Sequence, residues 1–223
     1  MTIGATLFDM DGLLIDSEIL WHEAEVEIFG SLGVDLDEAT DRSTKGLFVV
    51  EVVDYWYDRN PWSGPSRSDV VDQLLARVGE LIESKGRLLP GAERAIAITS
   101  ARGPVALASS TPLALIGRAL DHFGLRDSFV SLHSAEFEPY GKPHPGVFLS
   151  AATALRVAPD RCLVLEDSAA GVLAAKAARM TVVAVPTASD RRLAVFSLAD
   201  LVLESLEDLS EDWLDDRFAT SKV

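Results

Sequence analysis

Six short runs of almost uninterrupted apolar residues recur along the chain, and stretches with helical spacing separate them. The runs do not alternate strictly between apolar and polar residues, which is typical of strands covered on both faces of a parallel sheet. Strands that alternate with helices predict an α/β fold. The predicted strands lie at 2–8, 104–109, 129–134, 162–166, 182–186 and 201–205.

The interval between the first two predicted strands is about ninety residues long and has the spacing of helices instead. Apolar residues recur four positions apart near its start, and similar spacing continues in "VVDQLLARVGELI". "RNPWSGPSR" breaks these helices with two prolines and a glycine. We therefore expect a helical insertion over 17–88, here called the cap, within an α/β core made of 1–16 and 89–223. The apolar positions at its start are Leu20, Ala24, Ile28 and Leu32.

The chain of 223 residues carries a formal net charge of −15 and has no block of five or more Lys and Arg residues. This charge repels phosphate backbones and anionic lipid head groups, so we expect neither nucleic acid nor a membrane surface as a partner. A small anionic substrate remains compatible with it, because a metal ion and one or two lysines dominate the field nearby. Charges more than about 8 Å away are screened.

Cys162 is the sole cysteine, so no intramolecular disulfide can form. Its setting in "RCLVLED" is better explained by packing of a small apolar side chain than by thiol chemistry. The start, "MTIGATLFDM", lacks the basic region and cleavage site of a signal peptide, and no run reaches the ~18 apolar residues of a membrane span. We therefore expect a cytoplasmic protein, with a monomer as the working expectation.

The first predicted strand is followed by two aspartates, Asp9 and Asp11, two positions apart in "TLFDMDGLLIDSE". In a strand such residues point to the same side. Two carboxylates held together raise each other's pKa unless a cation lies between them. A simple Asp-Gly turn or half of an EF-hand would also contain these residues. The EF-hand lacks support, because "LLI" stands where further oxygen ligands are needed.

A second acidic pair, Glu166 and Asp167, ends another predicted strand, and Ser168 after it suits the N-cap of a helix. An acidic pair there can simply complement the helix dipole. Both acidic pairs nevertheless fall at the carboxyl ends of strands, where open parallel sheets bind their ligands. Oxygen ligands at that edge suit Mg²⁺, which binds through one or two carboxylates, several waters and a substrate phosphate.

Two other segments offer groups that a phosphate needs. "ALASSTP" places Ser109, Ser110 and Thr111 at a strand end, before a proline suited to the first turn of a helix. Hydroxyls and free backbone N–H groups there would bind an anion, although the same residues also serve as caps and turns. In "YGKPHPG", flanking prolines hold Lys142 stiffly in a loop, so it could present a fixed point charge. His144 is more simply a loop residue.

Four segments, "DMDGLLIDSE", "LASST", "GKPHPGVFL" and "LEDSAAG", occur in this order. They resemble the four motifs of the haloacid dehalogenase-like (HAD) hydrolases, in the subgroup with a helical cap after the first motif. The resemblance covers essentially the whole chain and implies a doubly wound, mostly parallel, Rossmann-like sheet with an inserted helical cap domain. "RNPWSGPSR", "KAARM" and "VVAVP" further resemble the bacterial sugar phosphatases of this subgroup, which act on 2-deoxyglucose 6-phosphate and hexitol phosphates.

The resemblance implies a phosphatase that forms an aspartyl-phosphate and acts on a small phosphorylated metabolite. Asp9 would be the nucleophile, and Asp11 would protonate the leaving sugar oxygen and later take a proton from water. Ser109 and Lys142 would hold the phosphoryl oxygens, with Ser110 also binding substrate.

Magnesium is the cofactor that the resemblance implies. Asp9, the backbone carbonyl of Asp11, and Asp167 would be its ligands, with Glu166 beside it or just outside the ligand shell. Mg²⁺ and Lys142 would then explain why two aspartates stand so close together.

Substrate choice rests on the cap. "STKGLFVVE" aligns with the cap loop that faces the substrate. Many relatives carry an arginine after this glycine, whereas here Lys45 is the obvious cation. Related sugar phosphomutases carry a histidine in the first cap helix. Trp21 aligns with it, and His22 falls one residue off, on another side of the helix. This favours a phosphatase, with Trp21 packing in the core or covering the substrate.

Three alternatives remain from the sequence. A β-phosphoglucomutase-like sugar phosphomutase and a phosphoglycolate phosphatase would use the same motifs. A receiver-type signalling module also places acidic residues, a hydroxyl and a lysine at the ends of a parallel sheet, but it leaves the cap and Asp11 unexplained.

Overall fold

The computed structural model describes residues 2–36 and 47–218 and contains one sheet of six parallel strands. The chain order is interrupted at the centre, because β1 pairs with both β2 and β4. The loops that follow these three strands therefore meet at the switch point of the sheet. The order is β3 (Ser131–Ser134), β2 (Val105–Ser109), β1 (Ala5–Phe8), β4 (Cys162–Glu166), β5 (Thr181–Ala184) and β6 (Leu201–Val202). The predicted α/β fold and its six strands are confirmed.

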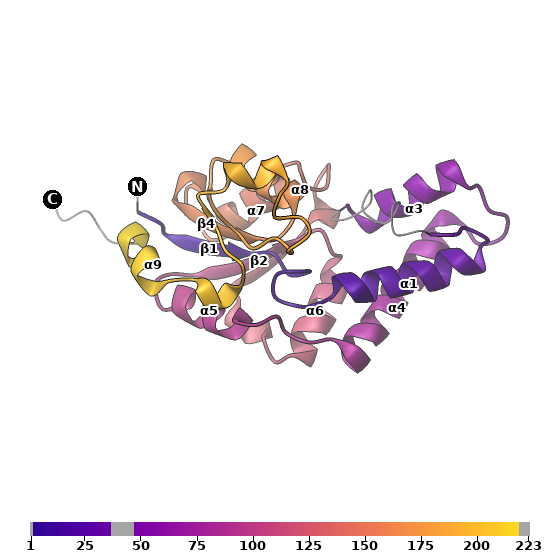
Figure 1. The fold of residues 1–223 in the computed structure, drawn as a ribbon, viewed down its shortest axis with the longest axis horizontal. Coiled ribbons are helices and arrows are strands. Elements are labelled where there is room, and N and C mark those ends of the chain that lie inside the picture. The colour runs from indigo at the N-terminus through magenta and orange to yellow at the C-terminus, as the bar shows by residue number, and fades with distance from the viewer. Residues whose placement is uncertain (1, 37–46, 219–223) are drawn as a thin grey trace.

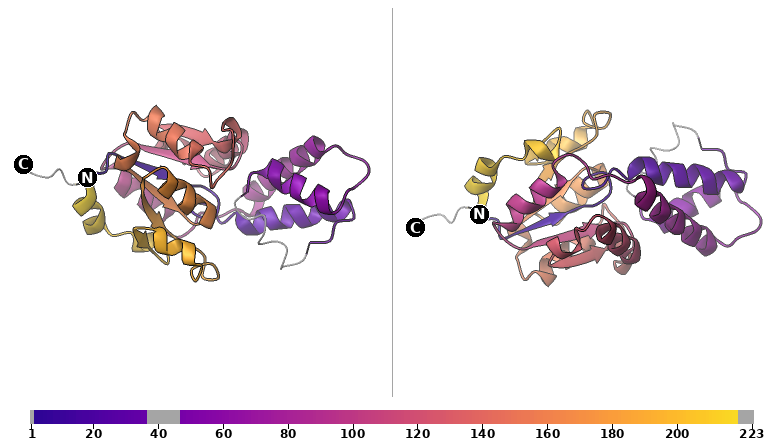
Figure 2. Two further views of the ribbon diagram at one scale, coloured as in Figure 1. Left: turned by 90° about the horizontal axis from the view of Figure 1, so that it is seen from above. Right: turned by 90° about the horizontal axis from the view of Figure 1, so that it is seen from below.

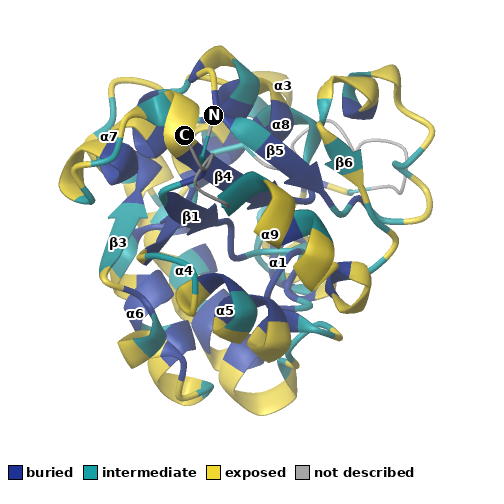
Figure 3. Cartoon of the chain, turned by 90° about the vertical axis from the view of Figure 1, so that its left-hand side faces the viewer, coloured by how far each residue is buried: buried dark blue, intermediate teal, exposed yellow. Residues whose placement is uncertain are grey.

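Helices cover both faces of the sheet (Figure 1, Figure 3). Every residue of β1, β2 and β4 is buried, which explains their continuous apolar runs. Neighbouring residues of β1 point to opposite faces: Phe8 lies in the apolar cluster with α5, α6 and α9, and Leu7 in the cluster with α7 and α8. These helices span Ala92–Ser100 (α5), Leu113–His122 (α6), Gly146–Ala154 (α7), Ala169–Ala177 (α8) and Glu211–Phe218 (α9).

Three further helices stand between β1 and β2 in the sequence: α1 (Glu18–Ser31), α3 (Val49–Arg59) and α4 (Arg67–Lys85). They lie together beyond the carboxyl ends of the strands, far from the two termini (Figure 2). Aromatic rings join them, since the Phe29 ring centroid lies 6.2 Å from that of Trp56 and 6.0 Å from that of Trp62. The break at "RNPWSGPSR" separates α3 from α4, where Ser66 caps α4 by accepting a hydrogen bond from the Asp69 amide. The predicted helical insertion is thus present.

The chain passes between these helices and the sheet twice, and the two passages pair with each other. The Asp16 amide donates to the Arg87 carbonyl over 2.9 Å, and the Leu89 amide donates to the Leu14 carbonyl over 2.8 Å. Ile15 and Leu88 form an antiparallel bridge between them. This junction falls at the predicted ends of the cap, and it supports our proposal of the boundaries 17–88.

Within residues 2–36 and 47–218, no helix combines the length and the apolar content needed to cross a membrane.

Candidate active site

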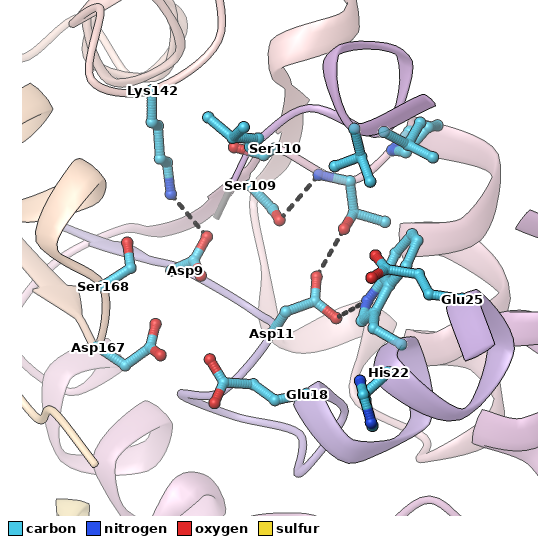
Figure 4. A pocket seen from close by; sticks show the side chains of 16 residues that line it. Asp9, Asp11, Glu18, His22, Glu25, Ser109, Ser110, Lys142, Asp167 and Ser168 are labelled. Carbon is cyan, nitrogen blue, oxygen red and sulfur yellow. Dashed lines mark hydrogen bonds and ion pairs between the residues drawn. The ribbon is translucent and has the colours of Figure 1, made fainter. Parts of the chain in front are cut away.

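The loops after β1, β2 and β4 meet the first cap helix around a cavity of about 170 Å³ (Figure 4). Strand alternation and the switch point place the chemistry-bearing residues here from segments far apart in the sequence. The cavity brings together seven of the predicted site residues: Asp9, Asp11, Trp21, Ser109, Ser110, Lys142 and Asp167. Glu166 lies behind it, in contact with Lys142. Lys45 lies outside the described residues.

Lys142 connects the loop before α7 with the strand ends. Its Nζ donates to Asp9 Oδ1 over 2.7 Å, to Glu166 Oε1 over 2.6 Å and to the Ala108 carbonyl over 3.1 Å. Burial lowers the pKa of Lys142, but the charges of Asp9 and Glu166 outweigh it and hold the pKa above its usual value. The lysine therefore stays cationic, and all three of its donors are directed to the centre of the sheet edge.

Asp9 is buried and lies 2.7 Å from the lysine, with the carboxylates of Glu166 and Asp11 close by. The pKa of Asp9 is raised to about 7: burial raises it most, Lys142 lowers it, and the charges of Glu166 and Asp11 raise it. The lysine thus offsets only part of the effect of burial and of the neighbouring carboxylates on this pKa. A further cation beside Asp9 would lower this pKa and stabilise the ionised carboxylate.

The residues for such a cation are present. Asp9, Glu166 and Asp167 each offer a carboxylate oxygen, and these atoms lie within 4.8 Å of one another. All three residues are buried, and Lys142 forms ion pairs with two of them, Asp9 and Glu166. Glu166 also accepts hydrogen bonds from the amide and hydroxyl of Ser168, which favours an outer position for it. An all-oxygen set with excess negative charge fits a divalent cation.

Gly12 leaves room for this acidic group. A Cβ at position 12 would collide with Asp167 Oδ2, and the backbone φ of +74° favours glycine as well. The glycine in "DMDGLL" is therefore required by both the turn and the neighbouring carboxylate.

Asp11 is held by three hydrogen bonds. Its Oδ1 accepts from Ser17 Oγ over 2.6 Å and from Trp21 Nε1 over 3.1 Å, and its Oδ2 accepts from Thr111 Oγ1 over 2.6 Å. The third aspartate of this segment, Asp16, contributes its backbone amide to the junction with Arg87. None of the three donors was predicted to bind Asp11. The signal that could have found two of them is the i, i+4 spacing of Ser17 and Trp21.

The phosphate side of the cavity follows β2. The Thr111 amide donates to Ser109 Oγ over 3.1 Å, and the first amide of α6, from Leu113, donates to Glu136 Oε1 over 3.0 Å. The prediction of free backbone N–H groups is therefore wrong for these two amides. Because a hydroxyl both accepts and donates, Ser109 keeps its own hydrogen for a bound anion.

The inner face of α1 contributes residues that the sequence analysis missed. Glu18, His22 and Glu25 line the cavity together with Trp21 (Figure 4). Their spacing of four and three positions is that of one helix face. His22, which the sequence places one residue off on another side of the helix, borders the same cavity as Trp21. Leu47, Val49 and Val52 line it as well.

The family model described as haloacid dehalogenase-like hydrolase matches residues 3–179, which include every strand-end residue of this site. The chain is a haloacid dehalogenase-like hydrolase. The resemblance seen in the four motifs is thereby confirmed.

Among HAD-like proteins, the chain is similar to hexitol phosphatase B of Escherichia coli strain K12. The two are 48% identical over 208 residues, which cover 92% of this chain and 94% of the relative. The fold resembles that of a β-phosphoglucomutase from Clostridium difficile, with a TM-score of 0.83, 26% identity and 97% of both chains covered. It also resembles CbbY of Rhodobacter sphaeroides in complex with phosphate, with a TM-score of 0.82, 29% identity, and 94% and 97% of the two chains covered.

Proposed function

We propose that this HAD-like hydrolase is a Mg²⁺-dependent phosphatase that releases phosphate from a small phosphorylated sugar or hexitol. The observation that carries the proposal is the pairing of two differently held aspartates in one cavity. Asp9 accepts a hydrogen bond from a buried lysine, whereas Asp11 accepts hydrogen bonds from the neutral donors of Ser17, Trp21 and Thr111. The similarity to hexitol phosphatase B along nearly the whole of both chains supports the substrate class.

Asp9 acts as the nucleophile in the first step. One carboxylate oxygen of Asp9 attacks phosphorus, and the bond from phosphorus to the substrate oxygen breaks with its electron pair on that oxygen. Lys142 lies 2.7 Å from Asp9 and fixes the orientation of its carboxylate. The product of this step is an aspartyl-phosphate and a free sugar or hexitol.

Asp11 donates a proton in the first step and accepts one in the second. A sugar alkoxide is a poor leaving group, so Asp11 gives its proton to the departing oxygen. It then takes a proton from the water that attacks the aspartyl-phosphate, and Asp9 leaves with the electron pair of its bond to phosphorus. Inorganic phosphate is released, and both aspartates return to their starting states.

Charge on the phosphoryl group is held by Ser109, Ser110 and Lys142 at the end of β2 and the loop before α7. Asp9, Asp167 and the Asp11 carbonyl would bind Mg²⁺, with Glu166 outside them. When bound, this ion supplies positive charge for the carboxylates and phosphoryl oxygens.

The sugar or hexitol would lie against the inner face of α1. Glu18, His22 and Glu25 there offer polar groups suited to hydroxyls, while Val49 and Val52 exclude water from the opposite side. Lys45 is retained as a substrate-binding proposal from the sequence. The cap would have to move for substrate to enter and product to leave.

A sugar phosphomutase is the second candidate, because the β-phosphoglucomutase from Clostridium difficile shares the fold over 97% of both chains. The sequence favoured a phosphatase because Trp21 replaces the mutase histidine. Trp21 supports that preference, since an indole can only donate a hydrogen bond and cannot relay a proton. His22 beside it lines the same cavity, so the mutase is included in the test.

The test is phosphate release by the purified protein with Mg²⁺ from a panel of substrates: hexitol 6-phosphates, hexose and 2-deoxyhexose 6-phosphates, β-glucose 1-phosphate and phosphoglycolate. Repeated release from the hexitol or hexose 6-phosphates is expected. Loss of β-glucose 1-phosphate without free phosphate would instead establish a mutase. Release from phosphoglycolate alone would overturn the sugar assignment, and a single stable phosphorylation without turnover would indicate a receiver-like module.

A further inference from the structure

We infer that Trp21 is a positioning residue for the proton-transfer step: its indole N–H fixes the orientation of the Asp11 carboxylate at the sheet edge. This inference rests on the proposed function of Asp11. It assigns Trp21 a role different from the substrate contact that the sequence suggested.

The two oxygens of Asp11 have different partners. Oδ1 accepts from Ser17 Oγ and Trp21 Nε1, both on the cap side, whereas Oδ2 accepts from Thr111 Oγ1 in the loop after β2. The Ser17 carbonyl accepts the Trp21 amide over 2.9 Å in the first turn of α1, so these two donors move as one unit. Asp11 therefore joins the cap helix to the sheet edge.

The donors differ in what they can do when Asp11 carries a proton. The hydroxyls of Ser17 and Thr111 can turn and accept a hydrogen bond, but an indole N–H can only donate. The Trp21 indole therefore donates to Asp11 Oδ1 in both protonation states. It holds the carboxyl group in one orientation while the proton lies on a side that faces a hydroxyl.

Thr111, the partner of Asp11 Oδ2, is itself held firmly. Its amide donates to Ser109 Oγ over 3.1 Å, and its carbonyl accepts from Ser134 Oγ over 2.7 Å. The carboxylate is thus held between a fixed loop on one side and the first turn of α1 on the other. Trp21→Phe removes one of the two donors on the α1 side and leaves the Ser17 hydroxyl, which can turn, as the partner of Oδ1.

The experiment compares Trp21→Phe with the wild type on two substrates, a hexitol 6-phosphate and p-nitrophenyl phosphate. The nitrophenolate leaves without a proton, so only the hexitol phosphate needs the acid. We expect kcat for the hexitol phosphate to fall about tenfold, with KM and the p-nitrophenyl phosphate rate changed less than about twofold. Trp62→Phe is the matched control, because the Trp62 indole donates to the Pro65 carbonyl between the cap helices, and both rates should stay within about twofold.

Equal losses on both substrates would show that Trp21 only supports the fold. A rise in KM with unchanged kcat would show that Trp21 contacts the substrate, as the sequence suggested. An unchanged hexitol phosphate rate would overturn the inference outright. If the wild type releases phosphate from neither substrate, the proposed function fails instead.

The hydrogen bond from Trp21 Nε1 to Asp11 can also be tested without an activity assay. This test does not require Trp21→Phe to fold. The chain has four tryptophans, so the indole N–H region of a ¹⁵N-labelled sample gives four signals. In Asp11→Ala, the signal of Trp21 should move upfield while the other three remain, because only this indole loses its acceptor. Four unchanged signals would overturn the inference.

Discussion

The two walls of the cavity differ in the kind of residues that form them and in the elements that position these residues. The sheet-edge wall consists of charged residues at strand ends, and its central member, Lys142, is only 3% exposed and contacts two buried carboxylates. The cap wall consists of one face of α1, where Glu18, Trp21, His22 and Glu25 border the cavity on an ordinary helix. The first wall carries the reaction in our proposal, and the second selects the substrate and aligns the acid. Changes to the two walls should therefore have different kinetic signatures.

The largest effect is expected from Asp9→Asn at the sheet edge. An amide cannot form the aspartyl-phosphate, so kcat should fall by at least about 10³-fold on every substrate, while the melting temperature changes little. Asp58→Asn, on the exposed surface of α3, is the control and should behave as the wild type. Appreciable residual turnover in Asp9→Asn would remove Asp9 from the role of nucleophile.

Asp11→Asn should show a smaller and selective loss. The general acid contributes about 10²–10⁴-fold, so hexitol phosphate hydrolysis should drop within that range while p-nitrophenyl phosphate loses much less in its first step. Burst kinetics on p-nitrophenyl phosphate measure that step separately from hydrolysis of the aspartyl-phosphate. Identical losses in the first step for both substrates would mean that Asp11 is not the acid.

Lys142→Met tests the electrostatics of the sheet edge through stability. Removing the lysine leaves Asp9 and Glu166 buried beside each other, and breaking a buried ion pair costs about 3–5 kcal/mol of unfolding free energy. Urea denaturation with EDTA present measures this cost. Lys176→Met is the matched control, because its pair with Asp200 is partly exposed and worth about 1 kcal/mol or less. Similar losses of unfolding free energy in the two variants would contradict the buried ion pairs of Lys142 with Asp9 and Glu166.

The smallest expected effect belongs to the cap wall. Glu25→Gln removes a charge that faces the cavity, and we expect KM for hexitol phosphate to rise about fivefold with kcat changed less than about twofold. Glu27→Gln is the control, since Glu27 pairs with Arg77 on the outer face of the cap. A large loss of kcat in Glu25→Gln would mean that the cap wall takes part in the chemistry.

The same contrast explains what could be predicted from the sequence. Asp9, Asp11, Glu166 and Asp167 stand in short segments where an apolar strand ends in charged residues, which is unusual and therefore predictable from the sequence. Lys142 was predicted from its position in a proline-rich loop. The six strands could be predicted equally well, because a sheet covered on both faces needs uninterrupted apolar runs. The structure confirmed the strands and brought these residues together.

The cap wall could not be predicted in the same way. Glu18, His22 and Glu25 have the spacing of any helix with a polar face, and nothing local distinguishes a face directed at a cavity from one directed at solvent. The hydrogen bonds of Asp11 depend on Thr111, which is 100 residues away in the sequence. The pairing of the Leu113 amide with Glu136 also depends on tertiary structure, and it overturned the expectation of a free helix amide.

The paired segments at 14–16 and 87–89 have a consequence for how such an enzyme can change. The polypeptide leaves the sheet and returns to it at one point. The inserted cap between these two passages is therefore an exchangeable segment whose length the sheet does not constrain. Exchange of that segment would alter which molecules are admitted while the phosphate chemistry at the strand ends stays intact. New substrate ranges could thus arise by recombination of a single contiguous stretch of gene, without rebuilding the catalytic edge.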